Sequence, residues 1–456
     1  MTASSSTIAV NELDEVVSSG RCIGCGMCSI PLSFAEATSK VDLVWSKDEE
    51  TWVPTIASSD AASLEQRVCP GAKVDMKALS QDVFGEQPED GFVGVTKSIQ
   101  AGYATDETVR KFAASGGVTT ALLQHWLNED IIDFAYCTAG LDPHNGKGQI
   151  ARYSDDLRNS AGSHYHPVNF GAALEELAES NERFAFVGLP CEVSAMRSVM
   201  AYRDDIAQRC VAIIGLFCGG INRYSGIGHY LSNFGVEAEN VEEIDYRDGV
   251  WPGQIALKQK NSSEIQRIPR IRGNSRWNIL RYMVSFQGYW MLPRCRICPD
   301  QISDFADLAV GDPHLTRFKE KESAGYSAVI ARTDTGEQLL QNAVADGIIC
   351  SEQLSRDELV ASQGYTLENR RHADVTRNMA RRLGIVAPEL KLYDDVKGAR
   401  SWHQHVYAFV DLYKIKIRKW TFLRPFYVPI QIGEYLFLTF SPRLIASRTK
   451  KLLKNK

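Results

Sequence analysis

Hydrophobic and polar residues alternate in two different ways along this chain. Between about residues 96 and 350, short β-branched or aromatic runs at 131–137, 184–187, 210–217 and 308–310 alternate with segments of helical periodicity. Several of these predicted strands end in glycine-rich turns. This alternation is typical of an α/β architecture. Residues 351–413 are predicted to be mostly helical and surface-like.

The first 85 residues follow another pattern. Two apolar runs, 41–45 and 52–56, flank the charged stretch 46–50 and predict a β-hairpin. Residues 81–95 are rich in Gly, Asp, Glu and Pro, which predicts a linker between this part and the α/β part.

One predicted helix begins at a glycine pair. Ser115 suits an N-cap, Gly116 and Gly117 open the first turn, and apolar residues then recur at helical spacing from Val118 to Trp126. Backbone amides at such a helix start can hold a pyrophosphate. Two glycines there are also common as turn chemistry alone, so both interpretations stay open.

Composition favours an intracellular enzyme. With 456 residues, 44% hydrophobic content and a formal charge of −5, the chain can bury two or more compact cores. The polar, acidic segment 1–17 does not resemble a signal peptide, so a cytoplasmic location is expected. No apolar run reaches the roughly 18 residues that a membrane-spanning helix needs, which predicts a soluble or peripheral protein.

The C-terminal segment differs in charge from the rest of the chain. Residues 414–456 contain eleven Lys and Arg against one acid, Glu434, so the remainder carries about −15. Seven aromatic residues are interleaved with these charges: Trp420, Phe422, Phe426, Tyr427, Tyr435, Phe437 and Phe440. This mixture suits an anionic membrane surface or an acidic redox partner. The alternative is a helical cap with solvated lysines. Nucleic acid is not an expected partner, because the body of the chain is acidic.

Four cysteines near the N-terminus have the spacing of a bacterial ferredoxin. Cys22, Cys25 and Cys28 form C-x2-C-x2-C, and Cys69 follows with Pro70 after it. This pattern predicts a 4Fe-4S cluster. Zinc is the alternative, but structural zinc sites favour paired C-x2-C motifs.

A second group of cysteines gives a weaker signal. Cys295 and Cys298 form one C-x2-C pair, and Cys191 and Cys218 follow predicted strands at the sheet edge where ligands bind. These four can hold a second cluster. Spacing alone leaves zinc, a redox dithiol or buried core cysteines as alternatives. Three further cysteines are predicted to lie in the core: Cys137, Cys210 and Cys350.

Eight motifs in order resemble the coenzyme F(420) hydrogenase and dehydrogenase beta subunit family, which also includes 7-hydroxymethyl chlorophyll a reductase-like proteins. The resemblance covers approximately residues 20–390. Its motifs are Cys-Ile-Gly-Cys-Gly-Met-Cys at 22–28, Ser-Gly-Gly-Val-Thr-Thr at 115–120, Ala-Gly-Ser-His-Tyr at 161–165, Val-Gly-Leu-Pro-Cys-Glu at 187–192, Gly-Leu-Phe-Cys-Gly-Gly at 215–220, Tyr-Arg-Asp-Gly-Val-Trp-Pro-Gly at 246–253, Arg-Cys-Arg-Ile-Cys-Pro-Asp at 294–300 and Ala-Asp-Leu-Ala-Val-Gly-Asp at 306–312.

The resemblance implies FAD and one or two 4Fe-4S clusters. It implies an N-terminal flavin-binding domain at 86–178 and a C-terminal domain with the second cluster candidate at 179–350. These two domains are expected between a ferredoxin-like 4Fe-4S module at 1–85 and a helical extension at 351–456. The implied flavin contacts are Ser115, Gly116, Gly117, Val118, Thr119, Gly162, Ser163, His164 and Tyr165. At His164 the family often has a lysine. The basic aromatic tail lies outside the family pattern.

Two functions are compatible with this set. The chain is expected to be an iron-sulfur flavoprotein oxidoreductase that passes electrons between coenzyme F(420) or ferredoxin and an organic substrate or redox partner. A flavin is needed there because it exchanges both hydrides and single electrons. The alternative is a non-catalytic relay subunit of a larger hydrogenase, dehydrogenase or membrane complex. No catalytic residue is predicted, although four groups can protonate a substrate or bind an anion: His164, Arg247, Asp312 and His314.

Overall fold

The computed structural model describes residues 12–32, 41–56, 66–140, 142–249, 251–270, 276–321, 325–396, 402–418 and 420–439. Its strands are β1 (Val41–Ser46), β2 (Thr51–Ile56), β3 (Lys73–Asp75), β4 (Ser98–Ala104), β5 (Phe134–Ala139), β6 (Lys147–Ala151), β7 (Phe184–Gly188), β8 (Cys210–Leu216), β9 (Val241–Asp248), β10 (Gln254–Gln259), β11 (Ile265–Ile268), β12 (Leu308–Gly311), β13 (Ser327–Ala331), β14 (Ile349–Gln353) and β15 (Glu389–Lys391).

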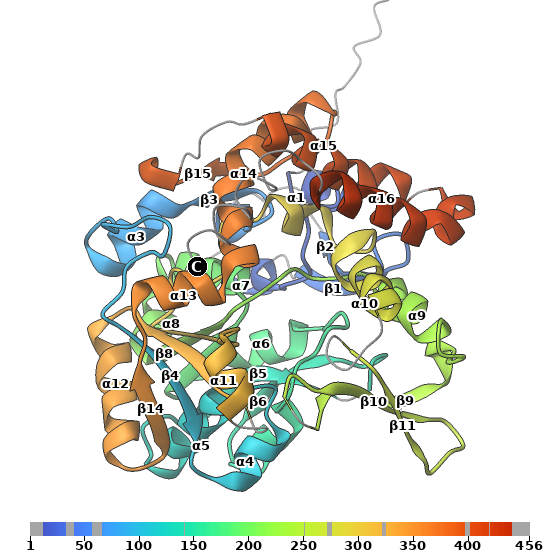
Figure 1. Cartoon of the computed structure of the whole chain (residues 1–456). Coiled ribbons are helices and arrows are strands. Elements are labelled where there is room, and N and C mark those ends of the chain that lie inside the picture. Colours follow the sequence, from blue (N-terminus) through green and yellow to red (C-terminus); the bar gives the residue numbers. More distant parts are fainter. Residues whose placement is uncertain are drawn as a thin grey trace, which may run out of the picture.

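The α-helices cover both faces of a central sheet and extend across the top of the view in Figure 1. They are α1 (Glu12–Ser18), α3 (Met76–Phe84), α4 (Glu107–Phe112), α5 (Val118–Asn128), α6 (Gly171–Glu179), α7 (Pro190–Met200), α8 (Asp204–Arg209), α9 (Tyr224–Ser232), α10 (Arg276–Met283), α11 (Thr316–Lys321), α12 (Asp334–Ala345), α13 (Arg356–Ser362), α14 (Gly364–Arg382), α15 (Trp402–Ile417) and α16 (Tyr427–Thr439). Among the described residues, no helix is long and apolar enough to cross a membrane.

The central sheet has eight strands in the order β14-β4-β13-β12-β8-β7-β5-β6. Its middle strands β12, β8, β7 and β5 run parallel, whereas β14, β4, β13 and β6 pair antiparallel with their neighbours. The α/β prediction is therefore confirmed. The four predicted strands correspond to β5, β7, β8 and β12, although β5 begins three residues later than expected.

Alternate residues of the central strands supply two hydrophobic cores. Phe134 and Tyr136 face the first core, whereas Ala135 and Cys137 face the second, as the two-residue period of a strand requires. Helices α5 and α12 cover the second core. The first core joins α6 and α7 to Ile23, Met27 and other residues of the N-terminal part. This core contains residues from more than one of the four predicted domains, and the division of the chain into these domains stays a prediction.

Smaller elements complete the predicted pattern. The hairpin expected at 41–56 is confirmed as β1 and β2, with Val44 opposite Val53. Residues 81–84 belong to α3, so the expected linker begins only after that helix. The short strand β3 pairs with β15, which ties the N-terminal part to the C-terminal helices. The sheet β11-β10-β9 lies to the lower right in Figure 1.

The three cysteines predicted to be core residues behave differently. Cys137 is buried in the second core, and Cys210 is partly buried against the first. The prediction is wrong for Cys350, whose side chain is exposed on the edge strand β14. Successive side chains of a strand point to opposite faces of the sheet, and here Ile349 is buried whereas Cys350 faces the solvent.

A buried charge network anchors α14 to the segment after Cys298. Asp304 accepts hydrogen bonds from Nη1 (2.8 Å) and Nη2 (2.5 Å) of Arg370, and both side chains are almost completely buried. Arg332 donates to the carbonyls of Val93 (3.1 Å) and Ile302 (2.9 Å). The Asp304 carboxylate thus has a bidentate partner in Arg370 and a second cation nearby in Arg332. These two cations offset the free-energy cost of burying its charge.

We expect Arg370→Met to reduce the free energy of unfolding by about 3 kcal/mol, because it leaves the Asp304 carboxylate buried without its main partner. Chemical denaturation at equal iron content measures this. Arg381→Met is the matched control, since Arg381 is exposed on the same helix. A loss no larger than that of the control would contradict the prediction.

Candidate functional site

The four N-terminal cysteines converge on one pocket. Cys22, Cys25, Cys28 and Cys69 line it, together with Leu13, Val16, Leu43 and the backbone around Gly24 and Gly26. Gly24 and Gly26 have φ of 74° and 72°, a conformation that favours glycine. Amides of Gly24, Met27, Gly71 and Ala72 donate hydrogen bonds to the sulfurs of Cys22, Cys25 and Cys69. Amide donors around converging sulfurs are typical of iron-sulfur sites.

The second group of cysteines also converges. Cys191, Cys218, Cys295 and Cys298 line one pocket beneath α14 and α15. The amides of Gly220 and Ile221 donate hydrogen bonds to the sulfurs of Cys218 (3.4 Å) and Cys295 (3.3 Å). The structure thus brings together the two strand-end cysteines and the C-x2-C pair, although Cys218 and Cys295 are 77 residues apart in the sequence.

Burial and mutual proximity change the acidity of these thiols. Burial raises the pKa of Cys22 to about 12 and that of Cys295 to about 11. In the first group the other cysteines raise the pKa of Cys25 further. In the second group Glu192, followed by the other cysteines, raises that of Cys191 further. Such thiols stay protonated unless positive charge enters the pocket, and metal binding supplies that charge and releases the protons.

Among the described residues, no group of three or more His, Cys, Asp or Glu side chains is arranged so that it could hold a metal ion. The empty space beside the first cysteine group is about 390 Å³, including its mouth. Four convergent thiols fit a 4Fe-4S cluster by donor type and number, and the same four donors match a structural zinc site.

Arg294 connects the two cysteine groups. Its side chain is 2% exposed, and its Nε donates to the carbonyl of Pro70, the residue after Cys69, at 2.9 Å. Burial raises the pKa of Cys69, Cys295 and Cys298, and the charge of Arg294 opposes this rise in both groups. Sequence reasoning missed this residue, because its position between the groups depends on the tertiary structure. Only its place beside the second C-x2-C motif was visible.

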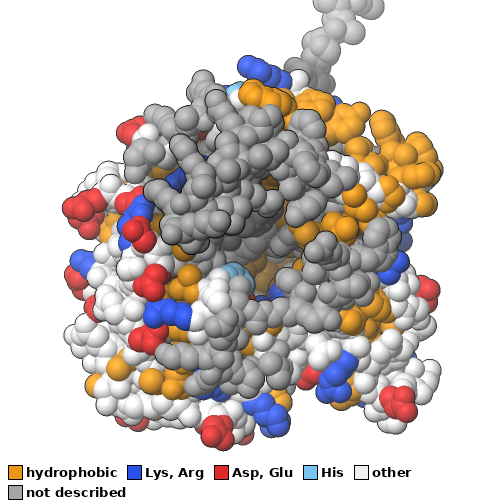
Figure 2. All heavy atoms as spheres, in the orientation of Figure 1, with side chains coloured by type: hydrophobic (Ala, Val, Ile, Leu, Met, Phe, Trp, Pro, Cys, Tyr) orange, Lys and Arg blue, Asp and Glu red, His pale blue; other side chains and the backbone are white. Residues whose placement is uncertain are grey.

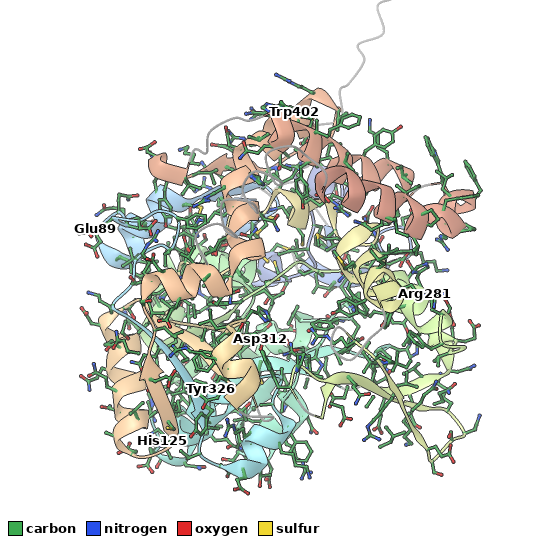
Figure 3. The ribbon with its side chains drawn as sticks, in the orientation of Figure 1. Glu89, His125, Arg281, Asp312, Tyr326 and Trp402 are labelled. Atoms are coloured by element: carbon green, nitrogen blue, oxygen red, sulfur yellow. The ribbon has the colours of Figure 1, made fainter. Side chains whose placement is uncertain are left out.

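The second cysteine group and the glycine turn lie along one edge of the sheet. Cys191 follows β7, Cys218 follows β8, and Asp312 follows β12, and these three strands are parallel neighbours. Ser327 begins β13 at the same edge. In Figure 3, Asp312 lies near the centre of the molecule, whereas Glu89 and His125 lie toward its periphery. Ligands of open α/β sheets bind at such an edge.

The turn before α5 packs against β13. The Ser115 hydroxyl lies 2.9 Å from that of Ser327, which also accepts from the Gly116 amide at 3.0 Å. A Cβ on Gly116 would lie 2.5 Å from the Gly102 carbonyl, and Gly117 has φ of 77°. Turn geometry and packing therefore account for both glycines. Gly117 has no side chain that could cap α5, so the first-turn amides of Val118 and Thr119 are candidates to bind an anion.

Arg247 joins this turn to the predicted segment 162–165. Its Nη2 donates to Asp312 (2.8 Å) and to the Ala114 carbonyl (2.6 Å), and its Nη1 lies 3.5 Å from the Tyr165 hydroxyl. Arg270 donates to the same hydroxyl at 3.0 Å. Trp251 donates to Asp312 at 3.2 Å. Arg247, on β9, therefore connects Tyr165 with Ala114, the residue before the predicted contacts at 115–119.

The local charges set the protonation of this network. Burial alone would raise the pKa of Tyr165, but Arg270 and Arg247 lower it below its usual value. The Asp312 pKa is lowered in the same way by Arg247 against the effect of burial. Burial lowers the pKa of His164 to about 4, which leaves a neutral imidazole at pH 7. His314 is exposed and lies 6.3 Å, between ring centres, from Trp251.

Comparison with known families matches most of this region. Residues 99–175 match the coenzyme F(420) hydrogenase/dehydrogenase beta subunit N-terminal region, and residues 181–357 match the C-terminal region of the same subunit. The chain belongs to this family. The predicted membership is confirmed, and the matched regions contain Ser115, Tyr165, Arg247 and all four cysteines of the second group.

Individual relatives agree with this assignment. Coenzyme F(420) hydrogenase subunit beta from Methanothermobacter thermautotrophicus is 25% identical over 266 residues, which are 56% of this chain and 84% of the relative. Coenzyme F(420)-dependent sulfite reductase from Methanocaldococcus jannaschii is 24% identical over 353 residues, 73% of this chain and 47% of that protein. A chain of the F(420)-reducing NiFe hydrogenase complex from Methanosarcina barkeri shares the fold, with a TM-score of 0.50 and 20% identity over 67% of this chain and 99% of that chain.

Proposed function

We propose that this chain is an iron-sulfur flavoprotein oxidoreductase that passes electrons between coenzyme F(420) or ferredoxin and an organic substrate or redox partner. The single observation that carries the proposal is the pair of four-cysteine pockets bridged by Arg294, with the second pocket at the same sheet edge as Asp312. In this proposal each pocket holds a 4Fe-4S cluster, the first within a ferredoxin-like module at 1–85.

The network around Arg247 is the proposed FAD site. Val118 and Thr119 would supply amides to the pyrophosphate, and Gly162, Ser163, His164 and Tyr165 would line the opposite side. FAD would exchange hydrides with an organic carrier and single electrons with the clusters. Tyr165 would give up the proton of its hydroxyl to the substrate, because two guanidinium groups favour the release of this proton. Neutral His164 would accept or donate a hydrogen bond without adding charge.

The first test of this function compares the electron donors that reduce the flavin. We expect reduced coenzyme F(420) or reduced ferredoxin to bleach the flavin band of the anaerobic protein much faster than NADH or NADPH, since the sequence has no G-x-G-x-x-G fingerprint for a nicotinamide dinucleotide. Stopped-flow spectroscopy measures this. Bleaching by NADPH alone at about 1 per second or more, a rate typical of turnover, would reverse the assignment.

The relay function is the second candidate, and the names of the relatives favour it. Several are beta subunits of hydrogenases or a formate dehydrogenase. Turnover of an organic substrate by the isolated chain decides for the enzyme. Electron passage only after a partner subunit is added decides for the relay.

A further inference from the structure

The last described segment carries hydrophobic side chains on its outer surface. Trp420, Phe422, Phe426 and Ile430 are 47%, 71%, 56% and 36% exposed, and we call them the aromatic face. They lie on the 3-10 helix η9 (Thr421–Phe426), next to it, and on α16. Figure 2 shows hydrophobic side chains gathered at the upper right, over this part of the chain. Monomeric proteins rarely expose several large apolar side chains together, so such a patch marks an interaction site.

The opposite side of the same segment fixes it to the protein body. Leu423, Tyr427 and Val428 pack against Val284, Tyr289 and Trp290. The Tyr427 ring stacks on that of Tyr289 with centres 3.8 Å apart, and it meets Trp290 edge-on. The segment is thus anchored by one face. The aromatic face is the side that this packing leaves outward, and the rings of Trp420 and Phe422 lie nearly parallel on it.

Positive charge accompanies the aromatic face. Arg424 is exposed between Phe422 and Phe426, and Lys416 is exposed on the preceding helix. In the sequence from 414 onward, eleven basic residues stand against one acidic residue, whereas the rest of the chain is strongly acidic. A basic and aromatic surface on an acidic protein is complementary to an anionic layer. Attraction to this layer would orient the protein with the aromatic face toward the layer.

We propose that the aromatic face binds an anionic lipid surface. Trp and Phe rings insert favourably into the region of the lipid headgroups, and the surrounding cations meet lipid phosphates. With 13 residues, α16 is shorter than the roughly 20 that cross a bilayer, so the contact is interfacial. The binding would hold the acidic body of the protein, including both cysteine groups, on the aqueous side.

Sedimentation with lipid vesicles tests this proposal. We expect the anaerobic full-length protein to bind vesicles of phosphatidylcholine with 30% phosphatidylglycerol, to bind pure phosphatidylcholine at least about tenfold less, and to be released by 0.5 M salt. Phe422→Ser with Phe426→Ser should reduce binding about tenfold. Arg424→Gln with Lys416→Gln should reduce it mainly at low salt.

Matched variants keep the test specific. Tyr153→Ser removes an aromatic ring of similar exposure, since Tyr153 is 73% exposed, but this residue follows β6 and is not part of the aromatic face. Lys111→Gln with Lys260→Gln removes two exposed charges elsewhere. Both should bind vesicles like the wild type, and unchanged iron content shows that each variant is folded. Equal loss in Tyr153→Ser and the double phenylalanine variant would overturn the proposal. Equal binding of the wild type to neutral and anionic vesicles would also overturn it. The same holds if the wild type binds no vesicles and the double phenylalanine variant changes only the oligomeric state.

Discussion

Cys25→Ser and Cys298→Ser are each expected to remove about half of the iron from the anaerobically reconstituted protein. If both pockets hold a 4Fe-4S cluster, the wild type contains about eight iron atoms, and the loss of one thiolate ligand prevents one cluster from being retained. Serine keeps the size of the side chain but offers a poorer ligand. Iron and sulfide analysis measures the loss, and low-temperature EPR of the reduced protein identifies which signal disappears.

Cys350→Ser is the matched control, because Cys350 is exposed on β14 and lies in neither pocket. It should keep all of the iron. Zinc in place of iron, or unchanged iron in Cys298→Ser, would contradict the second cluster while leaving the first untouched. Iron lost from both sites in Cys25→Ser would show that the two pockets, bridged by Arg294, form as one unit.

The cysteine pockets show how far spacing can predict a site. The first group could be read directly, since three of its ligands lie within seven residues and a short turn positions them. For the second group only Cys295 and Cys298 are close in sequence. Cys191 and Cys218 were found because each follows an apolar strand, and parallel neighbouring strands end at the same edge of a sheet. The prediction that these four converge depended on β7 and β8 being adjacent, which the structure confirms.

Residues that connect distant elements could not be predicted. Arg247 was a candidate only as a charged residue in a motif, and its contacts to Ala114, Tyr165 and Asp312 arise because β9 packs beside the end of β12. Arg294 bridges Pro70 to the second cysteine pair across more than 200 residues of sequence. The exposure of Cys350 was mispredicted because a short apolar run does not show which of two successive strand residues faces the core, and here that residue is Ile349.

Arg247→Ala is expected to lower turnover with reduced coenzyme F(420) about 100-fold, in the range found when one fixed donor is removed from an active site. The change removes hydrogen bonds to Asp312 and the Ala114 carbonyl, and it takes away one of the two cations beside Tyr165. A cation favours the deprotonated phenol, so its loss should raise the pKa of Tyr165. Any limb of the pH–rate profile that reports Tyr165 should therefore move to higher pH.

Iron content and a matched arginine separate this role from a structural one. Arg267→Ala removes a half-exposed arginine that pairs with Asp248 at the side of the same small sheet, and it should leave turnover and the pH profile unchanged. Arg247→Lys keeps the charge but has only one nitrogen, so it loses the second donor that Arg247 places beside the Tyr165 hydroxyl. It should restore the pH profile more fully than the rate. If Arg247→Ala retains iron and flavin and turns over at the wild-type rate, the network is structural, and the proposed site must lie elsewhere along the sheet edge.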